Sequence, residues 1–520
     1  MIQTEQGCVV ETSVITNCRY KKPIATINED GEVVIVYSPH DQKTGGTLIK
    51  KVTLLNMVAY NDKGEVLSFK PIDVANNFIL SKHLNDGVQK SDRYSQGLAM
   101  YFQFVLDSQA EWDAAFERGD VDPEWGDVRP DWNHFPRAKS ERLTYQFRDK
   151  LKELATASDG AMAKSVAKSY LSAVVSFYKY WLHRSPHLIS GEPFEFENIS
   201  LLLDAGATSM KRHYAKQIQT TDLRLKFAKP SLSGGTSLDH LRRDLKPFTN
   251  EEWRVLHNVI EKSRRVIRKG KSGRLESLPI EYSLHFMTCR FTGLRSEEAA
   301  SLHLGQIVRP ATKIEEGREV FTRGILSLGV GDQYGSWTKT PEAGNKSRTT
   351  IIPAKLMQSL YEYTQSERYK KRLAKFKLWC EQQHESGNTA LFEGHDGVNR
   401  DRHYLFISQT GKPMMLSVNE FSNRWTEVRD TANRTEGVQR PIVGSLHNLR
   451  ATFAVNVFRH LLKTITPDDA LARVSSLLGH ENYDTTLMYL KIAQDHPSAD
   501  EIYEDILNYT GVFDDWEGAQ

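Results

Sequence analysis

The sequence predicts a mainly α-helical protein with small β elements, in which a β-rich N-terminal region precedes a helical domain and a mixed α/β C-terminal domain. Two observations predict this order. The first 75 or so residues contain β-branched runs separated by glycine turns, whereas apolar and aromatic residues recur beyond them at spacings of three and four. A third observation, a pair of strand-like runs inside a helical C-terminal half, predicts the mixed character of the last domain. A chain of 520 residues is long enough for two or three domains.

The N-terminal region, residues 1–75, is expected to be β-rich. The runs at 33–37 and 48–54 are strand-like, and Asp30-Gly31 and Gly45-Gly46 supply turns. Two interpretations stay open for this region. It is either an accessory unit that binds DNA or a partner, or a small cap packed on the next domain.

Residues 76–235 are expected to form a helical domain, with helices over 91–106 and 163–181. The stretch 112–137, rich in Asp, Pro and Trp, is expected to be a long loop. The domain ends in a basic linker, whose cations fit phosphate contacts or, equally, a solvated helix face. These basic residues are Lys211, Arg212, Lys216, Arg224, Lys226 and Lys229.

The C-terminal domain is expected over residues 247–495, followed by an acidic tail or helix at 496–520. Thr249 and Glu252 form a capping box at a helix start. The runs 324–330 and 347–353 read as two strands of a hairpin, because they combine β-branched residues with flanking glycine and proline.

Four short segments of this domain carry the chemistry. They are Thr-Gly-Leu-Arg-Ser-Glu-Glu ending at Glu298, His447-Asn-Leu-Arg450, Leu-Gly-His480 and Tyr489. Two guanidinium groups suit the non-bridging oxygens of one phosphodiester, since each offers paired planar donors and a permanent charge. A phenol oxygen can attack phosphorus when neighbours stabilise the developing charge. The set therefore predicts phosphoryl transfer without a metal.

Each segment taken alone has an ordinary interpretation. An arginine after Thr-Gly-Leu is typical of a helix start, single histidines are usually structural, and Thr-Leu-Met-Tyr-Leu around Tyr489 is typical of helix packing. The joint occurrence in order, with Tyr489 nine positions after His480, favours the catalytic interpretation.

The order and spacing resemble the tyrosine recombinase (phage integrase) family over residues 247–495. The resemblance implies that residues 76–235 are a core-binding domain that forms half of a clamp on the DNA and that residues 247–495 are the catalytic domain. In the catalytic domain, Arg295 and Arg450 would clamp the scissile phosphate. The resemblance implies that His447 assists proton transfer at the tyrosine and that His480 donates a hydrogen bond to a phosphate oxygen. Tyr489 would be the nucleophile.

The resemblance also implies that Glu298 orients a catalytic neighbour and that a hairpin lysine acts as general acid toward the leaving 5′ oxygen. Lys339, in Trp-Thr-Lys-Thr, matches that lysine best. Lys346 is the competitor, and otherwise it would contact backbone phosphates together with Arg348. The 341–345 segment is longer than a tight turn, which leaves the register of the hairpin tip open.

Basic residues are concentrated instead of spread. The net charge is only +2, but residues 262–274 contain seven basic side chains and no acidic one. The segregation fits a DNA-binding face, and a solvated loop is the equal alternative. The DNA contacts expected here come from Arg264, Arg265, Arg268 and Lys269.

Other classes of chemistry lack their motifs. His447 and His480 have no metal-ligand spacing, and no Gly-x-x-x-x-Gly-Lys-Ser/Thr occurs, so no metal and no cofactor are expected. Four scattered cysteines are expected to be reduced thiols. No signal peptide or membrane span is expected, and the predicted location is the cytoplasm.

The resemblance implies a site-specific recombinase that cleaves and rejoins double-stranded DNA through a 3′-phosphotyrosine, for integration, excision or transposition of a mobile element. It implies a synaptic tetramer of the chain, with possible accessory proteins. A helix at 502–509 would dock into a neighbouring protomer or cap its own. The alternatives are a type IB topoisomerase, a hairpin telomere resolvase and a non-cutting DNA-binding regulator.

Overall fold

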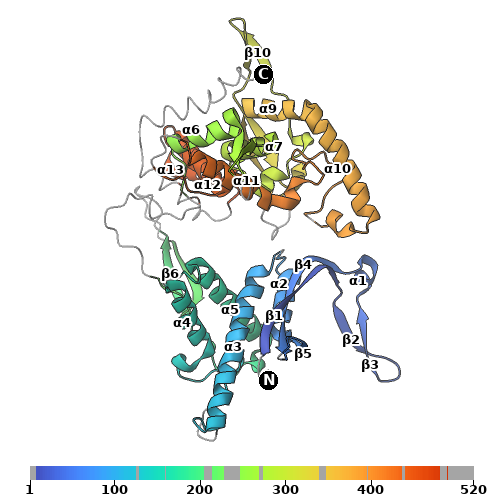
Figure 1. Ribbon diagram of the computed structural model, residues 1–520, viewed down its shortest axis with the longest axis vertical. Helices are drawn as coiled ribbons and strands as arrows, with labels where there is room; N and C mark the ends of the chain where they lie inside the picture. The colour runs from blue at the N-terminus through green and yellow to red at the C-terminus, as the bar shows by residue number, and fades with distance from the viewer. Residues whose placement is uncertain are drawn as a thin grey trace. The chain divides into compact units, whose positions relative to one another are not determined.

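The computed structural model divides into two compact units, residues 1–229 and 230–520, each of which is described by itself (Figure 1). The structure describes residues 8–61, 63–88, 90–123, 128–157, 160–203, 214–227, 246–268, 273–338, 347–394, 396–435, 440–480, 486 and 489. Across these residues the protein is mainly helical with small β elements, as predicted. No helix in the described ranges is long and apolar enough to cross a membrane.

The first unit begins with a three-stranded antiparallel sheet in the order β1-β4-β5. Its strands are β1 (Cys8–Tyr20), β4 (Thr47–Tyr60) and β5 (Val66–Pro71). A separate hairpin joins β2 (Pro23–Ile27) to β3 (Val33–Tyr37), and the short helix α1 (Pro39–Thr44) ends at the left-handed Gly45. The strands predicted at 33–37 and 48–54 are confirmed as β3 and part of β4.

The sheet shares one core with the helices of this unit. These are α2 (Asp73–Leu84), α3 (Asp92–Arg118), α4 (Leu143–Thr156) and α5 (Lys164–Arg184). Val52 and Leu55 of β4 are buried in this core, and the side chain of Asn76 on α2 exchanges hydrogen bonds with the backbone of Leu55 at 2.7 and 2.9 Å. The N-terminal strands are therefore packed as a cap on the helical bundle.

Two predicted helices are confirmed, and two expectations in the first unit are wrong. The helices expected at 91–106 and 163–181 are α3 and α5. However, α3 continues to Arg118, so the expected loop at 112–137 starts later, after Gly119 closes the helix with φ 77°. The hairpin β6 (Phe196–Leu203)–β7 (Tyr214–Thr221) interrupts a region expected to be helical. Of the basic linker, Lys211, Arg212 and Lys229 lie outside the described residues, and Arg224 forms an ion pair with Glu197.

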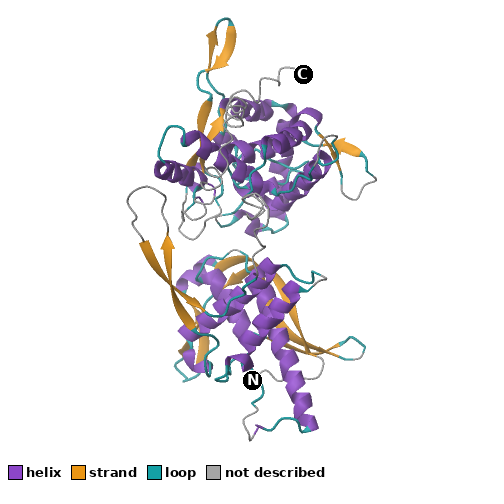
Figure 2. Ribbon diagram, turned by 90° about the vertical axis from the view of Figure 1, so that its left-hand side faces the viewer, coloured by secondary structure: helices purple, strands orange, loops and turns teal. Residues whose placement is uncertain are grey.

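The second unit is a helical body that also contains separate two-stranded pairs (Figure 2). Its first helix, α6 (Asn250–His257), starts at the predicted capping box of Thr249 and Glu252 and continues as the π-helix η5 (Asn258–Ser263). Helix α7 is central, because its residues from Glu281 to Thr292 are all buried. The helices that follow η5 are α7 (Ile280–Thr292), α8 (Ser296–Ala300), α9 (Ala354–Gln365), α10 (Glu367–Glu385), α11 (Val418–Ala432), α12 (Leu446–Leu461) and α13 (Pro467–Leu478).

The predicted hairpin of the second unit is confirmed. Strand β12 (Ile325–Val330) pairs antiparallel with β13 (Arg348–Pro353), and Val330 lies opposite Arg348. Strand β13 packs on α7 and α13, which places Arg348 beside the end of α13. Two further pairs were not predicted: β8 (Arg265–Ile267) with β9 (Leu275–Ser277), and β10 (Thr312–Glu315) with β11 (Arg318–Phe321). Short 3-10 turns lie at Lys139–Glu141, Pro186–Leu188, Leu304–Gln306, Asp332–Tyr334, Thr389–Phe392 and Met414–Ser417.

Candidate active site

Arg450, on α12, joins the elements of the candidate site. Its guanidinium is 1% exposed and donates from Nη1 to the carbonyl oxygen of Gly293 and from Nη2, at 2.6 Å, to that of Leu478. Both carbonyls lie at the C-terminal ends of helices, α7 and α13, where carbonyl groups lack intrahelical partners. Burial lowers the pKa of Arg450 to about 9, so the group remains a cation at neutral pH. One buried cation thus holds the two helix ends that precede Arg295 and His480.

Two glycines close these helix ends. Gly293 follows α7 with φ 66° and Gly479 follows α13 with φ 64°, in the left-handed region that glycine adopts without strain. A Cβ on Gly293 would lie 2.3 Å from Cδ1 of Phe453, and one on Gly479 would lie 2.7 Å from Cδ of Arg348. Backbone conformation and close packing therefore both require glycine in Thr-Gly-Leu-Arg and in Leu-Gly-His.

Glu298, on α8, is a buried carboxylate that three arginines surround. Its Oε1 accepts from Nη1 of Arg295 at 3.0 Å and from Nη1 of Arg348 at 3.1 Å, and its Oε2 accepts from Nη2 of Arg348 at 2.6 Å. Nη1 of Arg450 lies 4.0 Å from Oε2. Burial alone would raise the pKa of Glu298, but the arginines, led by Arg348, lower it to about 2. The ionised carboxylate orients the guanidinium groups around it.

Arg295 is the arginine of this cluster that is most open to a ligand. Its backbone N–H donates to Oε2 of Glu298 at 2.9 Å, which anchors Arg295 as the N-cap of α8. The Arg295 side chain is 19% exposed, compared with 10% for Arg348 and 1% for Arg450. Arg295 therefore presents its charge outward, while the other two arginines hold the site from within.

His480 and Tyr489 lie against the buried arginine. Nε2 of His480 is 3.0 Å from Nη2 of Arg450, and Nδ1 is 2.8 Å from the hydroxyl of Thr486. Because a guanidinium only donates, Nε2 accepts and Nδ1 carries the ring proton. Burial, followed by the charges of the nearby arginines, lowers the pKa of His480 to about 3, so the ring is neutral at pH 7. Tyr489 is buried and stacks on this imidazole, with centroids 6.3 Å apart and planes at 18°.

His447 lies at the outer edge of the site. It is half-buried in the first turn of α12, where its backbone N–H donates to the hydroxyl of Ser445, the N-cap, at 3.3 Å. Residues three positions apart share a helix face, so His447 and Arg450 project from the same side of α12. The charge of a protonated His447 contributes to the low pKa of His480.

The structure thus brings together five residues singled out in the sequence, with His447 at their edge. The five are Arg295, Glu298, Arg450, His480 and Tyr489. Lys339, Lys346 and Lys269 lie outside the described residues, as does the predicted helix at 502–509. The choice between Lys339 and Lys346 as hairpin lysine therefore stays a prediction.

Two of the expected DNA contacts, Arg348 and Arg268, have carboxylate partners within the protein, and their contacts with DNA stay a prediction. Arg348 does not face outward: it binds Glu298, and its Nε donates to the carbonyl of Leu477 at 3.1 Å. Arg268 is bound by the buried Glu427, with Nη1 3.0 Å from Oε2. In both cases a buried carboxylate needs a countercharge and takes the guanidinium from the surface.

Arg264 and Arg265, the other two expected DNA contacts of the basic run that the structure describes, are exposed. Arg264 adopts a left-handed conformation with φ 44° at the end of η5. Their DNA contacts stay a prediction.

Two residues support the site in roles that the sequence analysis did not predict. One is Arg348 in its role as the main partner of Glu298, for which no local signal exists because 50 positions separate the two. The other is His285 on α7, which is buried, stacks on Phe421 with centroids 3.7 Å apart and lies with Nε2 3.1 Å from the carbonyl of Ser296. Burial lowers the pKa of His285 to about 3, so it supports the first turn of α8 as a neutral ring.

Within the described residues, no group of three or more His, Cys, Asp and Glu side chains is placed to hold a metal ion. The arrangement instead offers guanidinium donors, two imidazoles and a phenol, which are groups that bind a phosphodiester and transfer protons near it.

No protein-family model matches the chain, and no curated protein matches it either. Among solved structures, the chain is similar to the Tn1549 transposon integrase in complex with transposon right end DNA. The identity is 12%, the TM-score is 0.40, and the match covers 83% of this chain and 98% of the other. A likeness at this level carries no functional argument. The argument for function rests on the site itself.

Proposed function

We propose that the protein is a site-specific DNA recombinase that cleaves and rejoins DNA strands through a 3′-phosphotyrosine, for integration, excision or transposition of a mobile element. The observation that carries the proposal is the convergence of Arg295, Arg450, His480 and Tyr489 around one buried carboxylate. Cations, a neutral imidazole and a phenol in one cluster fit an attack of tyrosine on a phosphodiester better than they fit a structural core.

The scissile phosphate binds between Arg295 and Arg450 in this proposal. Arg295 supplies an outward-facing charge. Nη1 and Nη2 of Arg450 are used by backbone carbonyls, but its buried Nε has no partner among the described residues. That N–H is the Arg450 donor left for a phosphate oxygen, and the dry surroundings strengthen its interaction with the charge that develops in the transition state.

His480 contributes as a neutral ring. Its Nε2 accepts from Arg450 in the DNA-free state. When the phosphate takes Nη2 of Arg450 in addition to Nε, Nε2 of His480 is freed, and the other tautomer of His480 can then donate to the phosphate. Thr486, which partners Nδ1 at 2.8 Å, is a hydroxyl that can donate or accept and so is compatible with both tautomers.

The reaction balances without an external energy source. The oxygen of Tyr489 bonds to phosphorus as its proton passes to His447, and the bond from phosphorus to the 5′ oxygen breaks. The leaving 5′ oxygen takes a proton from the hairpin lysine, Lys339 or Lys346, to become a hydroxyl. A 5′ hydroxyl of a partner strand then gives its proton to the lysine and attacks the phosphotyrosine, and the leaving oxygen of Tyr489 recovers its proton from His447, so that each broken phosphodiester is replaced by another.

The test is capture of the covalent intermediate. Duplexes that bind the protein are first selected from a random pool and then nicked so that the short cleaved fragment diffuses away. We expect the wild-type protein to form an adduct that maps to Tyr489, while Tyr489→Phe binds the same duplex with similar affinity and forms none, because phenylalanine lacks the attacking oxygen. Peptide mapping of the denatured adduct makes the measurement.

Tyr282→Phe is the matched control, because it removes a phenol hydroxyl that donates a hydrogen bond to Glu420, outside the cluster. An adduct of normal yield with Tyr489→Phe would contradict the proposal. Rejoining to a second duplex, compared with relaxation of a supercoiled plasmid, separates recombination from topoisomerase activity.

A further inference from the structure

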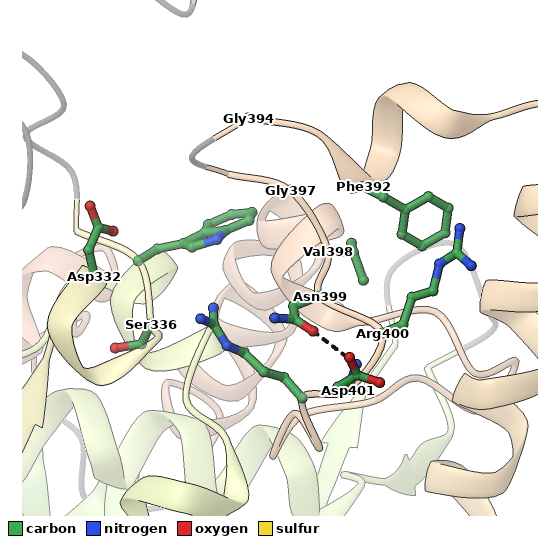
Figure 3. A pocket seen from close by; sticks show the side chains of 11 residues that line it. Asp332, Ser336, Phe392, Gly394, Gly397, Val398, Asn399, Arg400 and Asp401 are labelled. Carbon is green, nitrogen blue, oxygen red and sulfur yellow. Dashed lines mark hydrogen bonds between the residues drawn. The ribbon is translucent and has the colours of Figure 1, made fainter.

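A pocket of about 520 Å³ lies in the second unit, apart from the arginine cluster. Its walls come from two segments, residues 332–337 after β12 and residues 392–402 after α10 (Figure 3). Asp332 and Ser336 lie on one side of the opening, and Phe392 and Arg400 lie on the other (Figure 3). The volume is that of a small-ligand site, which typically measures about 300 to 1,000 Å³.

The pocket is connected to the candidate active site through α8. The backbone N–H of Trp337, which lines the pocket, donates to the hydroxyl of Ser301 at 2.8 Å. That hydroxyl in turn donates to the carbonyl oxygen of Glu298 at 2.8 Å. Helix α8 has five residues, so its two ends are separated by roughly 7 Å.

Two aromatic side chains give the pocket a preference for flat ligands. Trp337 and Phe392 both line it, and the guanidinium of Arg400 lies 4.5 Å from the centroid of the Phe392 ring. Arg400 is exposed and also contacts Nδ1 of His384 at 2.8 Å. Aromatic faces stack on any nucleobase, and an exposed arginine beside them suits a phosphate.

The polar groups of the pocket suit the edge of a base. The backbone N–H of Asp401 donates to Oδ1 of Asn399 at 2.9 Å, which fixes this turn, and the carboxylate of Asp401 is exposed (Figure 3). A carboxylate accepts from the exocyclic amino group of cytosine or adenine, whereas thymine carries no such donor. The charged side chains that line the pocket are two carboxylates, Asp332 and Asp401, and two guanidinium groups, Arg400 and Arg402, so the lining can accept both the amino edge of a base and a phosphate.

We propose that this pocket binds a nucleotide, with the base beside Trp337 and Asp401 and the phosphate toward Arg400. It prefers bases that carry an exocyclic amino group. The nucleotide is either free or an unpaired nucleotide of the DNA substrate near the cleaved bond. The second source rests on the proposed function, and the first does not.

The first experiment titrates the full-length protein with dCMP, dAMP and dTMP by isothermal calorimetry. We expect dCMP and dAMP to bind more tightly than dTMP, and Trp337→Ala to weaken dCMP binding about fivefold or more. Asp401→Asn should remove the preference over dTMP. Trp379→Ala is the matched control, because Trp379 is half-buried in the same unit and does not line the pocket.

The second experiment places 2-aminopurine, one position at a time, around the nick of the duplex used to trap the adduct. A fluorescence change at one position that Trp337→Ala abolishes and Trp337→Phe restores assigns the pocket to the DNA substrate. Nucleotide binding without such a change assigns it to free nucleotides. The proposal is overturned if Trp337→Ala changes neither the nucleotide affinity nor the 2-aminopurine fluorescence, while Trp337→Phe keeps the wild-type melting temperature.

Adduct formation at Tyr489 is read in the same samples. An adduct without any nucleotide or fluorescence signal from the pocket would leave the proposed function intact and would rule out nucleotide binding in the pocket. Nucleotide binding without adduct would support the pocket for free nucleotides and count against the recombinase.

Discussion

Glu298 shows how a single buried carboxylate organises the candidate site. It is fully buried, yet it is ionised because the guanidinium groups of Arg348 and Arg295 donate to it and that of Arg450 lies 4.0 Å away. A buried charge without partners is costly, so these contacts hold carboxylate and arginines in one geometry. Arg348 contributes two of the hydrogen bonds and is for this reason a positioning residue of the site.

We expect the stability of the second unit to depend on Glu298 at acidic pH. Its pKa falls from the ordinary 4.5 to about 2 on folding, so its contribution is complete above pH 4.5 and is lost as pH falls toward 2. The shift corresponds to about 3 kcal/mol. Glu298→Gln should destabilise the unit by about 3 to 5 kcal/mol at pH 7, because the arginines lose their countercharge. The substitution should also flatten the acid limb of a plot of unfolding free energy, measured with urea, against pH.

Glu297→Gln is the matched control for this experiment. It removes a charge from the same turn of α8, and no described contact joins Glu297 to the three arginines. An equal loss of stability in both variants would show that the helix turn, and not the arginine cluster, is responsible.

His480 should affect stability in a different pH window. Its pKa falls from the ordinary 6.5 to about 3 on folding, so below pH 6.5 the unfolded chain takes up a proton that the folded protein excludes. Stability therefore decreases as pH falls from 6.5 toward 3. Histidine NMR should show for the His480 ring, as for that of His285, a signal that does not titrate between pH 8 and 5. His480→Phe should remove that signal and the associated slope of stability with pH, whereas the exposed His187, changed to Phe, should leave both unchanged.

The sequence could indicate the individual groups of the site but not their partners. The motif residues were visible because Thr-Gly-Leu-Arg and Leu-Gly-His each place a charged or polar side chain after a glycine that ends a helix. By contrast, Arg348 and Arg268 read as surface cations. Their carboxylate partners lie 50 and 159 positions away, so only the folded structure shows that they are taken up internally.

At the scale of elements, the site is assembled from helix ends. The last turn of α7, the first turn of α8, the first turn of α12 and the last turn of α13 meet around Arg450. Helix ends expose backbone groups and carry partial charges, so they suit an anion and its binding cations. The geometry of the site therefore depends on how each helix terminates.

We expect Gly479→Ala to damage the site more than an ordinary helix-end substitution does. Alanine would strain the left-handed backbone and would also place its Cβ 2.7 Å from Cδ of Arg348, which would have to move away from Glu298. Gly119→Ala is the control, because Gly119 ends α3 with φ 77° and has nothing within 4 Å of its Cβ position. The control should cost about 1 to 2 kcal/mol in thermal unfolding.

Gly479→Ala should lower the unfolding free energy by more than the Gly119→Ala control does, and it should also lower the rate of adduct formation. Equal costs in both variants, with an unchanged rate, would mean that Arg348 yields freely and does not position the site.

The strand pairs differ in how far they could be predicted. Strands β12 and β13 are rich in Ile, Val and Thr, and their buried positions produce a clear pattern. The β10–β11 hairpin is almost wholly exposed and carries charged residues, so it has no apolar alternation to recognise. Its turn at Glu316 and Gly317, with φ of 49° and 80°, is a local signal that could have been used.

At the scale of the whole molecule, the two units have separate hydrophobic cores. Among the residues that the structure describes, the core of the first unit draws on residues of 1–229, and the two clusters of the second draw on residues beyond 230. The candidate site lies entirely within the second unit. The first unit is therefore expected to contribute to cleavage through binding and not through chemistry.

Deleting residues 1–71 should consequently be more harmful to the protein than deleting the entire first unit. The shorter deletion removes β4, whose buried side chains include Ile49, Val52, Leu55 and Val58, and so exposes the faces of α2 and α3 that pack on it. Losing this burial costs on the order of 10 kcal/mol, which is comparable to the stability of a domain. We expect the 72–520 protein to aggregate, as measured by light scattering.

The 230–520 protein keeps both of its own cores and should unfold cooperatively on heating. We expect it to form the Tyr489 adduct only at higher DNA concentration, because the chemical groups remain and one source of binding is lost. A soluble 72–520 protein with a sharp unfolding transition for the first unit would contradict this view, and would show that the N-terminal strands are a separable accessory and not part of the helical core.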